Sequence, residues 1–149
     1  MSTFFFCLFQ FGYGQAQLDF VSNIDYQELH DAELNDVWGY VDEVGNEYAV
    51  IGTTKGTSIV DVTDPVNPQE IFWLDGAQSI WRDPKVFGDY AYVTSRIDGA
   101  VTVIDVSDPE SPILIEEIQM GNGLNSISDV ESVFVLDDLL YVSSRFSNS

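Results

Sequence analysis

The chain has very little positive charge. Among its 149 residues, five lysines and arginines stand against 25 aspartates and glutamates, so the formal net charge is −20. A surface of this kind repels phosphate backbones and anionic lipid headgroups, which makes nucleic acids and membranes poor candidates for partners. A solvated, highly soluble surface accounts for the acidity without a dedicated cation-binding role, and we adopt that interpretation.

Histidine and cysteine are almost missing, with one residue of each, His30 and Cys7. Ser-His-Asp and Cys-His sites and structural zinc sites need more of these residues, and no Gly-x4-Gly-Lys phosphate loop occurs. A lone histidine in a polar segment is expected to be solvated. We therefore assign no catalytic residue, and only carboxylates are left for acid/base chemistry or for Ca²⁺ binding.

No hydrophobic run is long enough to span a bilayer. The apolar stretch 4–11 is followed by small residues at 14–16, as in secretory signal peptides. We expect a signal peptide over residues 1–16, an exported form that begins near Gln17, and a lead-in segment over 17–33. A buried N-terminal strand is the alternative for the first segment. Cleavage would remove the only cysteine, so packing alone would hold the exported protein together.

Two nearly identical segments dominate the rest of the sequence. Ile-Val-Asp-Val-Thr-Asp-Pro at 59–65 and Val-Ile-Asp-Val-Ser-Asp-Pro at 103–109 lie 44 residues apart. Each is typical of a β-branched strand that stops at a turn, where aspartate accepts backbone N–H groups and proline withholds a donor. A repeat of this length built from strands and turns has the size of one propeller blade. No window sustains a helical pattern, so the predicted fold is all-β.

The predicted units are 34–79, 80–125 and an incomplete 126–149, which together make a β-propeller fragment of about two and a half four-stranded blades. The predicted strands are 34–41, 47–52, 57–61 and 69–74 in the first unit, 80–87, 90–95, 101–105 and 113–118 in the second, and 128–135 and 139–145 in the third. A closed ring has about four to eight blades, so the remaining blades are expected in a longer chain.

The sequence resembles the LVIVD-repeat propellers of bacteria, in particular the choice-of-anchor B group. The resemblance lies in the two repeated turn segments and in stretches 35–41, 47–52 and 81–86, and it extends over about residues 34–145. It implies an exported protein, secreted or held at the cell surface, that often carries a C-terminal sorting tail. It implies no particular activity, because the family has none that is generally established.

Three pairs of aspartates are candidate oxygen ligands for Ca²⁺. They are Asp61 with Asp64, Asp105 with Asp108, and Asp137 with Asp138. Their spacing is not that of an EF-hand loop, and the turns explain the first two pairs without a metal. We therefore favour structural turns, expect no cofactor, and keep Ca²⁺ as the alternative.

Three further aspartates, Asp36, Asp83 and Asp129, fall near the starts of the three units, 47 and 46 residues apart. Equivalent positions of adjacent blades form a ring around a propeller axis, so these residues could line a channel mouth together with Arg82, Lys85 and Glu131. The alternative, which we favour, is that each carboxylate accepts backbone N–H groups and joins one blade to the next.

The aromatic residues Tyr40, Trp73 and Trp81 are expected to pack in the core or between blades rather than to form a carbohydrate platform. The leading functional hypothesis is a non-catalytic extracellular propeller that acts as a binding or scaffold module for a protein or carbohydrate. Two alternatives stay open: a propeller lyase, hydrolase or dehydrogenase whose active-site residues lie in further blades, and a structural spacer beside an adhesive domain.

Overall fold

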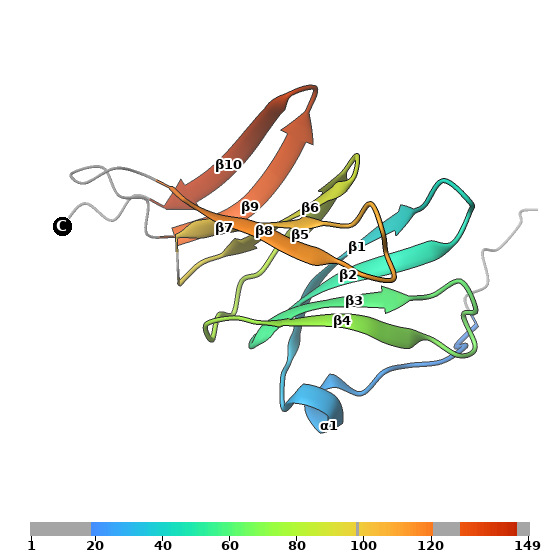
Figure 1. Cartoon of the computed structure of the whole chain (residues 1–149). Coiled ribbons are helices and arrows are strands. Elements are labelled where there is room, and N and C mark those ends of the chain that lie inside the picture. The colour runs from blue at the N-terminus through green and yellow to red at the C-terminus, as the bar shows by residue number, and fades with distance from the viewer. Residues whose placement is uncertain (1–18, 98, 121–128, 146–149) are drawn as a thin grey trace, which may run out of the picture.

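A computed structural model describes residues 19–97, 99–120 and 129–145 (Figure 1). The signal peptide predicted for residues 1–16 lies outside these ranges. Within them the only helix is α1 (Tyr26–His30), which is too short to cross a membrane. All other regular elements are strands, so the predicted all-β class is confirmed.

The strands form two complete four-stranded antiparallel sheets and one strand pair, in chain order. The first sheet contains β1 (Leu34–Val41), β2 (Glu47–Thr53), β3 (Gly56–Asp61) and β4 (Gln69–Asp75). The second contains β5 (Pro84–Phe87), β6 (Tyr90–Ser95), β7 (Ala100–Asp105) and β8 (Ile113–Gln119), and the pair is β9 (Asp129–Leu136) with β10 (Leu139–Arg145). We call them blade 1, blade 2 and blade 3. The described blades do not close a ring.

The blades meet along their first strands. Strand β1 lies against β5, and β5 lies against β9, so the three first strands share one inner edge (Figure 1). Within each complete blade the following strands add outward in sequence order. This radial order is that of a propeller, in which the first strand of every blade faces the axis.

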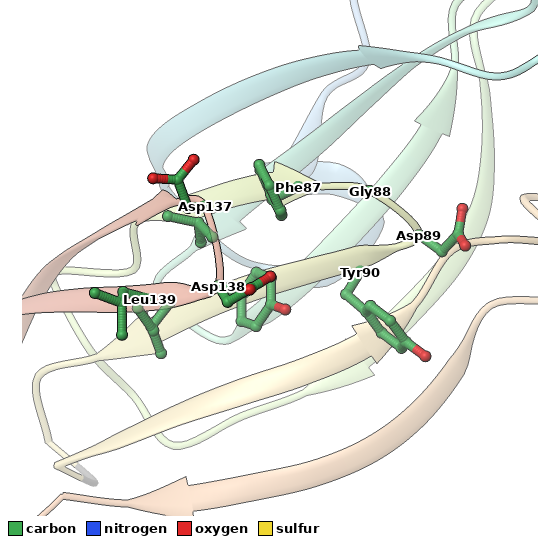
Figure 2. A pocket seen from close by; sticks show the side chains of 10 residues that line it. Phe87, Gly88, Asp89, Tyr90, Asp137, Asp138 and Leu139 are labelled. Atoms are coloured by element: carbon green, nitrogen blue, oxygen red, sulfur yellow. The ribbon is translucent and has the colours of Figure 1, made fainter.

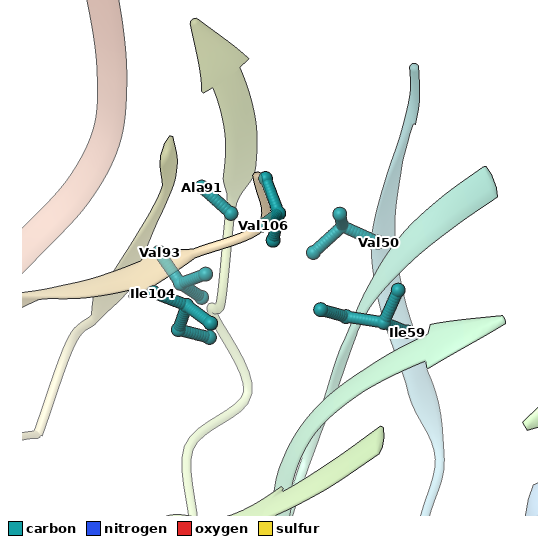
Figure 3. Close-up of a cluster of buried hydrophobic side chains, with 6 residues drawn as sticks. All are labelled: Val50, Ile59, Ala91, Val93, Ile104 and Val106. Atoms are coloured by element: carbon teal, nitrogen blue, oxygen red, sulfur yellow. The ribbon is translucent and has the colours of Figure 1, made fainter. Parts of the chain in front are cut away.

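The core lies between blade 1 and blade 2. Val50 and Ile59 of blade 1 point toward Ala91, Val93, Ile104 and Val106 of blade 2, and each of these side chains is at most 3% exposed (Figure 3). Five of them occur on the middle strands β2, β3, β6 and β7, and Val106 directly follows β7, two positions after Ile104. Since neither sheet can cover this face alone, the apolar burial that stabilises one blade also fixes the position of the next.

The repeated turns are built from aspartate, as predicted. Asp61 Oδ1 accepts the N–H of Thr63 at 2.8 Å, and Asp105 Oδ1 accepts the N–H of Ser107 at 2.9 Å. The second aspartate of each motif does the same for the residue two positions later, in Asp64 and Asp108. Both motifs therefore end their strands through the same local hydrogen bonds.

One strand boundary differs from the prediction by more than one residue. The predicted strand 80–87 begins only at Pro84, because the preceding residues make hydrogen bonds outside the sheet of blade 2. Ser79 Oγ donates to the carbonyl of Trp81 and accepts its N–H, and the Arg82 side chain turns toward blade 1. These contacts make 80–83 a connecting loop at the inner edge.

Gly52 lies where the backbones of the two complete blades approach closely. A Cβ at this position would lie 2.0 Å from the carbonyl oxygen of Arg82. We predict that Gly52→Ala lowers the free energy of unfolding by about 1–3 kcal/mol, because the backbone of blade 2 must shift. Gly39→Ala is the matched control, since its Cβ would meet nothing nearer than 3.9 Å. Urea denaturation of the full chain measures both, and equal stability of the two variants would contradict the prediction.

Candidate functional site

A hollow of about 370 Å³ lies at the inner edge, where the first strand of each blade begins. All three blades line it, through Leu34, Asn35, Asp36, Ile80, Trp81, Arg82, Asp83, Glu131 and Ser132. We call this hollow the mouth pocket. It contains Asp36, Arg82, Asp83 and Glu131 from the set that the sequence suggested for a channel mouth.

Arg82 binds back to blade 1. The residue is only 4% exposed, and its guanidinium donates to the carbonyl oxygens of Thr53 at 2.6 Å and Ala77 at 2.9 Å. Backbone carbonyls are suitable acceptors for the fixed fork of guanidinium donors. A Cβ at Gly76 would lie 2.6 Å from Nη2, so the guanidinium occupies space that a larger residue would fill.

Asp83 binds forward to blade 3. Its Oδ2 accepts hydrogen bonds from Ser132 Oγ and from the N–H of Val133 at 3.2 Å, and its Oδ1 accepts one from Lys85 Nζ. Burial alone would raise the pKa of Asp83, but the hydrogen bonds from Lys85 and Ser132 lower this pKa below its ordinary value. The carboxylate is therefore ionised at neutral pH, and its oxygens are occupied by donors from the protein.

Asp36 completes the polar cluster. The pKa of Asp36 is raised above its ordinary value. Burial is the largest cause, and the hydrogen bond with the Asp83 carboxyl is the second. The ammonium of Lys85 lies 3.9 Å from Asp36 Oδ2 and 4.9 Å from the ring centroid of Trp38. Lys85 thus places one positive charge beside two carboxyl groups, which limits their mutual repulsion.

The strand registers show which positions of blades 2 and 3 are equivalent. The first hairpin of blade 2 turns at 88–89, and that of blade 3 turns at 137–138. Asp83 and Ser132 each lie five residues before their turn. Ser132 therefore occupies the same strand position in blade 3 as Asp83 does in blade 2, and it lies 49 residues later in the sequence.

The interpretation of Asp129 as that counterpart is wrong. Its carboxylate lies 3.9 Å from Arg96 Nε, and it does not line the mouth pocket. Asp129 matches Asp83 in residue type but not in strand position. The correct signal was present in the sequence, because Tyr92 and Tyr141 are also 49 residues apart.

A family comparison agrees with this architecture. The LVIVD repeat model matches residues 41–75 and 77–119, more than half of the chain. The chain belongs to the LVIVD-repeat family. The first LVIVD repeat contains β2 to β4 and the second contains β5 to β8. No curated protein and no solved structure gave a match.

The aspartates of the LVIVD turns use their oxygens locally. Asp61, Asp64, Asp105 and Asp108 each accept a backbone N–H through Oδ1, as described above. In the described ranges no group of three or more His, Cys, Asp or Glu residues is arranged to hold a metal ion. Asp137 lies in the β9–β10 turn with a φ of 53°, a left-handed conformation that aspartate tolerates. The observed bonds are those of structural turns.

The three aromatic residues differ in their surroundings. Tyr40 packs against the core and stacks on Tyr48 with ring centroids 5.0 Å apart, and Trp73 stacks on His30 at 3.6 Å. Trp81 departs from the expected packing, because it is 50% exposed at the rim of the mouth pocket. The bonds of its backbone to Ser79 hold this loop in place while the indole remains accessible to solvent.

His30 is not the solvated residue that the sequence suggested. It lies 2.9 Å from both carboxylate oxygens of Glu70 as well as against the Trp73 ring, and its side chain is only 17% exposed. Tyr26 reinforces the same contact by donating to Ser58 Oγ, which in turn donates to Glu70. The lead-in segment is thereby attached to blade 1. Nothing near His30 in the sequence indicates this, because its partner is 40 residues away.

We predict that removing the Asp83 carboxylate weakens the junction between blades 2 and 3. Asp83→Ala leaves the donors of Ser132 and Val133 without a partner, so the free energy of unfolding should fall by about 1–3 kcal/mol. Asp83→Asn retains one acceptor and should cost less. Urea denaturation of the full chain measures both. If Asp83→Asn were more stable than the parent, and if added Ca²⁺ no longer changed its stability, the result would instead indicate a cation site.

The same junction should depend on pH. The folded-state pKa of Asp83 is lowered, so its contribution to stability is present above the unfolded pKa and is lost as the pH falls through the folded value. The raised pKa of Asp36 acts in the opposite direction. We expect the stability difference between the parent and Asp83→Asn to shrink between about pH 7 and about pH 3. Thermal melts across that range test this, and a constant difference would contradict it.

Proposed function

We propose that the chain is part of a bacterial LVIVD-repeat protein of the choice-of-anchor B group, secreted or held at the cell surface. Its propeller serves as a non-catalytic binding or scaffold module. The partner, a carbohydrate or a protein, contacts the mouth pocket. The extracellular location rests on the resemblance and on the signal-like sequence of residues 1–16.

One observation supports the binding role above the others. The polar floor of the mouth pocket is bonded internally, whereas the rim exposes Trp81 by 50% and Ile80 by 69%. A rigid polar floor beside an accessible aromatic face resembles the small-molecule sites in which apolar area gives affinity and a few polar groups give orientation. Asn35 and Glu131 border the same hollow, so an amide and a carboxylate lie near the indole.

Carbohydrate is the partner chemistry that fits this combination best. Sugar rings stack on exposed indoles through their apolar faces, and their hydroxyl groups bind amides and carboxylates. A protein partner would use the same indole as a buried anchor. Both kinds of partner would therefore use the same residues of the mouth pocket, and a binding experiment with each kind of partner distinguishes them.

An enzymatic role has one observation in its favour. The pKa values of Asp36 and Asp83 are shifted in opposite directions, as in many pairs that act as general acid and general base. Against it, Asp83 is occupied by Lys85, Ser132 and Val133, so its oxygens face donors of the protein. We therefore place catalysis second.

The binding role predicts a clear effect of Trp81→Ala. An array of bacterial and plant oligosaccharides, probed with the labelled full chain, should show at least one bound glycan whose affinity falls about tenfold or more in the variant. Phe20→Ala is the matched control, because Phe20 is 81% exposed in the lead-in segment, away from the pocket. Glycan binding that survives Trp81→Ala unchanged would contradict the proposed site, and hydrolysis of the bound glycan would favour the enzymatic role.

A further inference from the structure

Two grooves lie between the blades at the end opposite the mouth pocket, where the first strand of each blade turns into the second. The groove between blades 1 and 2 has a volume of about 580 Å³ and includes Tyr40, Glu43 and Asp89 in its lining. The groove between blades 2 and 3 has a volume of about 440 Å³ and includes Phe87 and Asp138. Figure 2 shows the second groove, with side chains of both blades around one hollow.

The two grooves are the same structure built twice. In the first hairpin of each blade, Tyr40 pairs with Tyr48 and Phe87 pairs with Tyr90. On the next strand, Tyr48 pairs with Asp61 and Tyr90 pairs with Asp105, the first aspartate of each repeated turn. Tyr40 and Phe87 are therefore equivalent residues. Each supplies an aromatic ring to a groove, and the turn of the next blade supplies an aspartate to the same groove, so the arrangement recurs from blade to blade.

The second groove has mainly apolar walls, the first groove has a mixed polar and apolar lining, and both are acidic at the rim. The second groove has Tyr92, Val135, Leu139 and Leu140 in its walls, and among the described residues no lysine or arginine lines either groove. Four rim carboxylates make no hydrogen bond or ion pair with the part of the chain that the structure describes: Glu43, Asp89, Asp137 and Asp138. This differs from the mouth pocket, where Asp83 is bonded to both a lysine and a neighbouring blade.

Tyr40 adds an observation of a different kind. Its hydroxyl is buried and has no hydrogen-bond partner among the described residues, although Tyr40 lines the first groove. A buried hydroxyl without a partner costs free energy in the isolated protein. A ligand that supplies an acceptor would remove this cost.

We propose that the two grooves are successive subsites for one extended peptide segment that carries both basic and apolar side chains. The apolar side chains enter the grooves against Tyr40 and Phe87, and the lysines or arginines meet the rim carboxylates. Because the Tyr40 hydroxyl is buried in the free chain, the Tyr40 ring has to shift on binding so that a peptide carbonyl accepts its hydrogen bond. A neutral sugar would leave the rim charges unused, and a metal ion would leave the apolar walls unused, so a basic peptide fits the lining better than either. This surface is separate from the mouth pocket and does not depend on the function proposed there.

The test is a fluorescence anisotropy titration of the full chain with a labelled peptide in which lysine–phenylalanine pairs alternate with glycine. Asp89 lines both grooves, so Asp89→Asn should weaken binding about two- to fivefold, in the range of a lost exposed ion pair. Glu117→Gln removes the same charge from the exposed outer strand β8 and should leave binding unchanged. Equal weakening by both variants would show that only the net charge attracts the peptide, and would overturn the proposal.

Tyr40→Phe provides a second, independent measurement. Without the unpartnered hydroxyl the free chain should melt at the same temperature or higher, whereas peptide affinity should fall about two- to tenfold, the range of one hydrogen bond. Replacing lysine with glutamate, or phenylalanine with alanine, in the peptide should abolish binding. The proposal would be overturned if either altered peptide bound as tightly as the original. It would also be overturned if the Tyr40→Phe variant and the Asp89→Asn variant both kept full affinity for the original peptide.

Discussion

Two neighbouring side chains that bind in opposite directions hold the described blades together at their inner edge. Arg82 donates to carbonyls at the end of β2 and in the loop after β4, and Asp83 accepts from β9. Buried charged groups are tolerated only where their hydrogen bonds are satisfied, so each residue requires its neighbour blade in one position. The apolar core between blades 1 and 2 supplies nondirectional stabilisation, while this dipeptide selects the arrangement.

The surroundings of the dipeptide follow from that requirement. Gly52 and Gly76 leave room for the Arg82 backbone and guanidinium, respectively, where any Cβ would collide. Because residues 80–83 are committed to these contacts, they cannot continue β5, and the loop that results exposes Trp81 at the rim. The accessible indole is thus a consequence of how the blades are joined. A ligand at this rim would meet a floor that is already fixed, which reduces the entropy lost on binding.

Much of the fold was predictable from the sequence, because strands and turns are determined locally. The alternation of β-branched residues and the two Asp-x-Ser/Thr-Asp-Pro turns gave nearly all strand positions. The contacts between residues far apart in the sequence were not predicted. The attachment of His30 to Glu70, the exposure of Trp81 and the role of Ser132 depend on which strands become neighbours, and residue type alone does not reveal this. Asp129 shows this directly, because it matches Asp83 in residue type but lies at a different strand position.

The change from aspartate to serine at the equivalent position has a physical reason. Burial and the neighbouring Asp83 carboxyl raise the pKa of Asp36, and the ammonium of Lys85 lies beside both carboxyl groups. A third carboxylate at position 132 would face Asp83 without a second lysine in β9, and like charges at this distance disfavour ionisation. A hydroxyl in its place donates to Asp83 and stabilises the ionised form. The inner edge of the described blades therefore repeats its backbone in all three first strands, whereas the carboxylate of blades 1 and 2 is replaced by a hydroxyl in blade 3.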